Sequence, residues 1–150
     1  STMVVSPDQR LVATLAFGGR LEIRDAQTLD LIAFKKTELA RGRTMQAMMR
    51  AYAGFFQFAT FSHDGGTLAT VDNNRASLWD TSRFLQDADS RANGEQKLTQ
   101  LATIRRPGKI DAIAFSPTDS SLAMAAANGQ LTIWDARSPG EPQAVIENKQ

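Results

Sequence analysis

The 150-residue sequence contains no cysteine and only one histidine, His63. Without thiols the chain has no disulfide framework, no thiol nucleophile and no cysteine-ligated zinc. A single histidine argues against a multi-histidine metal site and against a serine–histidine relay. No apolar run approaches the ~18 residues of a membrane helix. The composition therefore indicates no metal, no cofactor and no membrane segment.

The chain also has little net charge, with a formal value of +1, while 42% of its residues are hydrophobic and 22% are charged. These proportions are typical of a packed globular protein. The balance argues against nucleic-acid binding through the charge of the whole molecule, although a local basic patch remains open. The first ten residues have no apolar core of signal-peptide length. We therefore expect an intracellular, cytoplasmic protein, with a nuclear location also open.

One pattern occurs three times along the chain, over Val5–Asp25, Phe61–Asp80 and Phe115–Asp135. Each copy has an apolar run ending in serine, a tight turn, an alternating run, a second turn and another alternating run. The first turns contain proline, aspartate or glycine, and the second turns read Gly-Gly, Asn-Asn and Asn-Gly. Such residues favour tight turns and two-residue hairpins. A further apolar stretch follows each copy, so the repeat predicts four antiparallel strands per unit.

The ends of the repeats carry a family resemblance. The second and third copies end in Trp79-Asp80 and Trp134-Asp135, and the first ends in Arg24-Asp25. Together with the turns and the small residues of the second strand, these endings resemble the WD-repeat β-propellers. The resemblance implies an all-β propeller segment of three four-stranded antiparallel blades, incomplete as a ring by itself. The family's histidine before the first strand is absent, so we expect its buried hydrogen-bond network to be missing and packing to supply the rigidity.

We expect one partial propeller over residues 1–150. Blade 1 covers about 2–34, an inserted helix or loop 35–56, blade 2 about 57–104 with a polar loop over 82–97, and blade 3 about 108–147. Propellers typically close with 4 to 8 blades. Three blades should therefore leave two flanking apolar sheet faces, covered by the remaining blades of a longer chain or by another subunit. A homodimer with six blades is the alternative.

Three segments are candidates for contact with partners. After Thr44, the insertion places apolar side chains at the i, i+3, i+4 and i+7 positions of a helix, namely Met45, Met48, Met49 and Tyr52. This helix either docks a partner protein or folds against its own blade. A basic cluster, Arg105, Arg106 and Lys109, is either a solvated turn or a contact for acidic groups. In the polar loop, Phe84 and Leu85 either pin the loop to its own blade or anchor a partner.

The resemblance implies a noncatalytic scaffold for protein–protein interaction, one that presents propeller loops to partners within a larger chain or complex. The sequence has no phosphate-binding glycine loop, no GxSxG elbow and no HExxH pair, and we expect no enzymatic activity and no cofactor. Two alternatives stay open. One is a propeller associated with RNA or ribonucleoprotein through the basic loop clusters, and the other is the sensor part of a larger multidomain enzyme.

Overall fold

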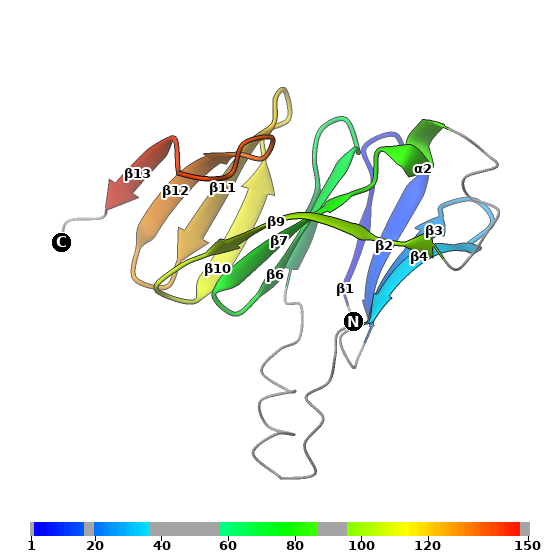
Figure 1. The fold of residues 1–150 in the computed structure, drawn as a ribbon, viewed down its shortest axis with the longest axis horizontal. Helices are drawn as coiled ribbons and strands as arrows, with labels where there is room; N and C mark the ends of the chain where they lie inside the picture. Colours follow the sequence, from blue (N-terminus) through cyan, green and yellow to red (C-terminus); the bar gives the residue numbers. More distant parts are fainter. Residues whose placement is uncertain (1, 17–19, 37–57, 87–95, 148–150) are drawn as a thin grey trace, which may run out of the picture.

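The structure, a computed structural model, describes residues 2–16, 20–36, 58–86 and 96–147. Figure 1 shows three β-sheets side by side, with the green middle sheet between the blue and the yellow-to-red ones. The inner strands of the three sheets, β1, β5 and β10, lie next to one another. Within these residues the sheets form an open arc and no closed ring, as expected from the repeat.

Each repeat folds into one antiparallel four-stranded unit, which we call a blade, with the strands in chain order from inside to outside. The prediction of three such blades is confirmed. The strands of blade 1 are β1 (Thr2–Val5), β2 (Leu11–Ala16), β3 (Arg20–Asp25) and β4 (Leu31–Lys36). Those of blade 2 are β5 (Phe58–Phe61), β6 (Thr67–Asp72), β7 (Arg75–Asp80) and β9 (Thr99–Arg105). Those of blade 3 are β10 (Ile110–Phe115), β11 (Ser121–Ala126), β12 (Gln130–Asp135) and β13 (Ala144–Glu147).

Blade 2 is the centre of the core because both of its faces are covered. Successive side chains of a strand point to opposite faces of its sheet. In β7, Trp79 therefore packs towards blade 1 while Leu78 packs towards blade 3. We call the side of a blade that faces the preceding repeat its upstream face, and the side that faces the following repeat its downstream face. The four central residues of β6 and of β7 are buried, because both faces of this sheet are covered. This explains why both strands are mostly apolar instead of alternating between apolar and polar residues.

The two tryptophans lie on upstream faces, and each finds a hydrogen-bond acceptor in its own blade. Trp79 Nε1 donates to Thr70 Oγ1 over 2.9 Å, and Trp134 Nε1 donates to Thr132 Oγ1 over 2.9 Å. Both threonines are buried. A buried indole N–H without an acceptor would destabilise the fold. A threonine hydroxyl thus accepts the indole N–H in two blades that lack the family's histidine. The rigidity of these blades therefore rests on a buried hydrogen bond as well as on packing.

The expectation of a polar loop over 82–97 needs correction at both ends. Residues Arg83–Gln86 form a helical turn, α2, whose Phe84 is fully buried between blades 1 and 2. At the other end, Gln96–Lys97 form a short strand, β8, which pairs in parallel with Ala33 and Phe34 of β4. Strand β8 leads through Leu98 into β9, so one segment connects the outer edges of blades 1 and 2 (Figure 1).

The upstream face of blade 1 was expected to be apolar and is mixed, because it carries the exposed side chains of Met3 and Val5 and also a charged cluster. The upstream face of this blade carries Glu22 between two arginines, with Arg20 Nε 2.8 Å from Oε1 and Arg24 Nη2 2.8 Å from Oε2. Arg24 stands where blades 2 and 3 have tryptophan. The guanidinium of Arg20 also lies 4.6 Å from the ring centre of Phe34. Ion pairs and a cation–π contact thus occupy part of this face, beside the exposed side chains of Met3 and Val5.

Candidate partner-binding surface

At one end of the blades, aspartate carboxylates accept hydrogen bonds from residues of the same turn. In blades 1 and 2, Asp8 and Asp64 accept hydrogen bonds from the hydroxyls of Ser6 and Ser62, both over 2.6 Å. Each carboxylate also accepts a backbone N–H two residues further on. Blade 3 uses Asp119 in the same way for the N–H of Ser121. The hydrogen bonds of these carboxylates stabilise the turns, as expected for aspartate in tight turns.

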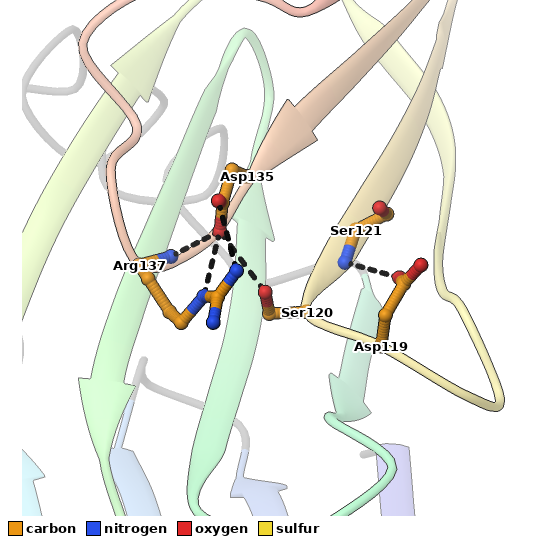
Figure 2. A network of polar contacts seen from close by, with 5 residues as sticks. All are labelled: Asp119, Ser120, Ser121, Asp135 and Arg137. Carbon is orange, nitrogen blue, oxygen red and sulfur yellow. Dashed lines mark hydrogen bonds and ion pairs between the residues drawn. The ribbon is translucent and has the colours of Figure 1, made fainter.

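The aspartates that end the repeats cap the next turn. Asp25, Asp80 and Asp135 each accept the backbone N–H two residues later, over 2.8, 2.9 and 2.9 Å. Figure 2 shows the fullest version, in which Asp135 also accepts the Ser120 hydroxyl and two nitrogens of the Arg137 guanidinium. The five motif residues singled out by the repeat, two tryptophans and three aspartates, therefore occupy packing and capping positions in the described structure.

These contacts lower the pKa of three capping carboxyls, those of Asp64, Asp119 and Asp135. The Arg137 guanidinium, followed by the Arg137 N–H and the Ser120 hydroxyl, holds the pKa of Asp135 below its ordinary value. The N–H of Ser121 lowers the pKa of Asp119, and the hydroxyl of Ser62 lowers that of Asp64. A carboxyl whose pKa is lower in the folded state stabilises the fold above its unfolded pKa. That contribution disappears as the pH falls through the folded pKa, in the acidic range.

Substituting Arg137→Ala is expected to raise the pKa of Asp135 towards its ordinary value, because the largest cause of the lowering is removed. NMR titration of the side-chain carboxyl in both proteins measures this pKa. Asp64 in blade 2 is the internal control, since its partners are unchanged. An identical Asp135 titration in the two proteins would contradict the assignment of Arg137 as the main partner.

The opposite end of the blades carries the predicted basic cluster, on the connection between β9 and β10. Arg105 is exposed and, among the described residues, forms no ion pair. Lys109 Nζ lies 3.8 Å from Asp111, with about half of each side chain in solvent. In the neighbouring strand, Arg75 stands directly opposite Arg105 and pairs with Asp72 over 2.6 Å. We call Arg75, Arg105, Arg106 and Lys109 the basic edge.

The backbone of the basic edge is fixed by the turns on either side. Arg106 donates its N–H to Asn74 O over 2.8 Å and accepts the side-chain amide of the same asparagine over 3.0 Å. The N–H of Ile110 bonds to Asn73 O, and Lys109 O accepts the N–H of Ala127, each over 2.8 Å. The connection is therefore bonded to both blade 2 and blade 3, so Arg105 and Lys109 project from a rigid support.

Arg106 differs from its two basic neighbours because its side chain is partly buried. Its guanidinium donates to Gln130 Oε1 and lies 5.8 Å from the Trp134 ring centre. This contact joins the connection to blade 3 and leaves less of the charge accessible to a partner. Within the sequence-predicted cluster, the side chains of Arg105 and Lys109 are exposed, whereas Arg106 is partly buried and contacts blade 3.

The other predicted partner segment, with Met45, Met48, Met49 and Tyr52, lies outside the described residues. The prediction for Phe84 and Leu85 has an outcome: Phe84 is fully buried and Leu85 packs against the same cluster. Both hold α2 on the protein itself.

Within residues 2–16, 20–36, 58–86 and 96–147, histidine, aspartate and glutamate form no cluster suited to a metal ion. None of the helices described there has the length and apolar character that a membrane crossing requires.

Comparisons with known proteins support the fold. No protein-family model matches the sequence. A search of curated proteins also finds no match. Among solved structures, U3-55K superimposes with a TM-score of 0.69 at 14% identity, covering 99% of this chain and 39% of that one. The WD40 repeats of RRP9 give 0.69 at 15% identity, with coverages of 99% and 38%.

A third similar structure is Sqt1 from Chaetomium thermophilum, bound to the N-terminus of a ribosomal protein. Its TM-score is 0.68 at 17% identity, covering 97% of this chain and 35% of that one. The chain therefore spans less than two fifths of the length of these structures. The repeat, the three blades and these superpositions together identify a WD-repeat propeller-like fold.

Proposed function

We propose that this three-blade segment is a noncatalytic scaffold whose basic edge binds an acidic segment of a partner protein, within a larger chain or complex. One observation carries the proposal. Arg105 and Lys109 are exposed cations, and the backbone connection that holds them is hydrogen-bonded to the blades on both sides. A support that is already ordered loses little entropy on binding. The cytoplasm is the proposed location, with the nucleus as the second candidate.

The chemistry of the edge favours carboxylates as ligands. Arginine offers a planar fork of donors that matches a carboxylate, and lysine adds a point charge. Arg75 is already paired with Asp72, and Lys109 lies 3.8 Å from Asp111, so among the described residues Arg105 is the exposed cation of the edge without an ion pair. The solved complex of Sqt1 with the N-terminus of a ribosomal protein supports protein segments as ligands of this fold.

The test is fluorescence anisotropy with a labelled aspartate- and glutamate-rich peptide. Replacing Arg105→Glu and Lys109→Glu together is expected to weaken binding by about tenfold, because two attractions of ~0.2–1 kcal/mol each become repulsions. The matched control is Lys97→Glu, an exposed charge reversal on β8, separated from Arg105 by the length of β9 (Thr99–Arg105). Binding should also weaken as salt is added.

Equal affinity of the double variant and the Lys97→Glu control would reject the basic edge as the binding surface. A single-stranded RNA of similar length serves as the competing ligand. Tighter binding of that RNA, with a steep linear fall of log affinity against log salt, would assign the edge to nucleic acid and overturn the proposal.

A further inference from the structure

Three cationic side chains lie at one margin of the interface between blades 1 and 2. Arg75 and Arg105 stand directly opposite each other on β7 and β9, so both side chains lie on the same face of blade 2. This is the upstream face, because Trp79, four residues after Arg75 on the same strand, packs towards blade 1. On blade 1, Lys35 stands opposite Leu21, whose side chain is buried in the same interface. Lys35 therefore lies on the downstream face of blade 1, which faces blade 2.

The three cations lie at the same end of their blades. The outer strand of blade 1, β4, ends at Lys36, which stands opposite the first residue of the third strand of that blade. The outer strand of blade 2, β9, ends in the same way at Arg105, opposite Arg75. Lys35, one residue before the end of β4, is thus placed beside the end of blade 2 that carries both arginines.

The next interface shows that side chains bridge two blades at this place. Arg106 directly follows the outer strand of blade 2, and its guanidinium donates to Gln130 of blade 3. Gln130 is the first residue of the third strand of its blade, as Arg75 is in blade 2. The end of an outer strand therefore lies within side-chain reach of the start of the third strand in the following blade.

The corresponding margin between blades 2 and 3 has balanced charges. By strand register, the counterparts of Lys35, Arg75 and Arg105 are Ile104, Gln130 and Glu147. The side-chain amide of Gln130 donates to Glu147 Oε1 over 3.2 Å and accepts from the Arg106 guanidinium. One cation and one anion are thus joined through a neutral amide.

The margin between blades 1 and 2 has an excess of positive charge. Asp72 lies 2.6 Å from Arg75 Nη2, whereas Lys35 and Arg105 are exposed and form no ion pair among the described residues. Three cations and one paired carboxylate leave an excess of two positive charges. Like charges directly opposite each other on neighbouring strands are also destabilising, so an anion bound between the arginines would relieve their repulsion.

We propose that Lys35, Arg75 and Arg105, which we call the junction site, bind the phosphate monoester of a phosphorylated serine or threonine. This inference rests on the proposed function, since the phosphate is carried by the partner segment that the basic edge binds. A phosphorylated side chain carries about −1.5 to −2 charges near neutral pH and three acceptor oxygens, which match the excess charge of the site. Arginine binds phosphate through paired hydrogen bonds, and lysine adds a point charge. One carboxylate, with a single charge, would neutralise only part of this excess.

The test compares two labelled peptides by fluorescence anisotropy. They share one acidic sequence and differ in a single serine, which is phosphorylated in one of them. The unmodified protein is expected to bind the phosphorylated peptide at least about fivefold tighter, because charge-assisted hydrogen bonds to the phosphate are added. Lys35→Gln is expected to reduce this preference at least about twofold, since it removes one of the two cations without an ion pair.

The matched control is Lys109→Gln, which also removes an exposed lysine charge. Lys109 lies beside Asp111 of blade 3 and outside the junction site. This variant is expected to weaken the binding of both peptides alike and to leave the preference for the phosphorylated peptide unchanged.

Equal affinity of the unmodified protein for the two peptides would overturn the inference, and so would a preference that Lys35→Gln leaves unchanged. The proposed function fails separately, since it depends on the unphosphorylated peptide and on Arg105→Glu with Lys109→Glu. A single-stranded RNA that binds more tightly than the phosphorylated peptide, and more weakly to Lys35→Gln, would assign the site to phosphodiesters and also overturn the inference.

Discussion

Replacing Phe84→Ala is expected to lower the free energy of unfolding by about 3–5 kcal/mol, the range for a buried aromatic ring. The ring is fully buried within the cluster formed by blades 1 and 2. It belongs to α2, whose Leu85 carbonyl accepts a hydrogen bond from Arg10 Nη1 over 2.8 Å. Truncation therefore leaves a cavity at the place where the two blades and the helical turn meet.

Urea unfolding followed by circular dichroism measures this loss. The matched control is Leu85→Ala on the same turn, whose side chain is only partly buried and whose removal should cost less. If Phe84→Ala unfolds at the same urea concentration as the unmodified protein, α2 does not contribute to the interface between blades 1 and 2.

The second large effect is expected for Trp134→Ala at the other interface, between blades 2 and 3. This tryptophan is 5% exposed, and the expected loss is again about 3–5 kcal/mol. Part of the loss comes from Thr132, a buried residue whose hydroxyl no longer receives the indole N–H. The cation–π contact with Arg106 is lost as well, so the basic edge loses one of its supports.

The repeat itself provides the control for this prediction. Arg24 occupies the position of Trp134 in blade 1, but on a face without a covering blade. Arg24→Ala should change the unfolding free energy by only ~0–1 kcal/mol, the range for exposed ion pairs. Equal losses for the two variants would mean that the tryptophan position stabilises a blade without help from its neighbour, contrary to the packing described here.

The strands were predictable because their signals are local. Alternation, turn residues and the recurring final aspartate place each strand in sequence, and three copies confirm one another. The capping role of aspartates such as Asp64 and Asp135 follows equally from turn chemistry. The position of the basic cluster on a connection between blades also follows from the order of the strands.

Other features depend on contacts between distant parts of the chain, which a local pattern does not contain. The parallel pairing of Gln96–Lys97 with β4 brings together residues more than sixty positions apart in sequence. The burial of Phe84 requires two blades and a helical turn at once. The acceptors of the indoles differ between blades, Thr70 on β6 and Thr132 on β12, although the tryptophans share one repeat position. The sequence shows that Arg24 stands at the tryptophan position of blade 1. Its ion pair with Glu22 could not be predicted, because it depends on the geometry of the strand.

The native mass of the unmodified chain, measured by sedimentation over a wide concentration range, tests the central claim most directly. The claim is that the three blades form one open propeller segment, in which blade 3 leaves an apolar face uncovered, with Ile133 and Ile146 on it. The account predicts the 16.4 kDa monomer as the smallest species, with no discrete dimer, and weak association that Ile133→Lys reduces. A discrete dimer that persists on dilution and dissociates on Ile133→Lys would show that two copies complete each other, and would contradict the account.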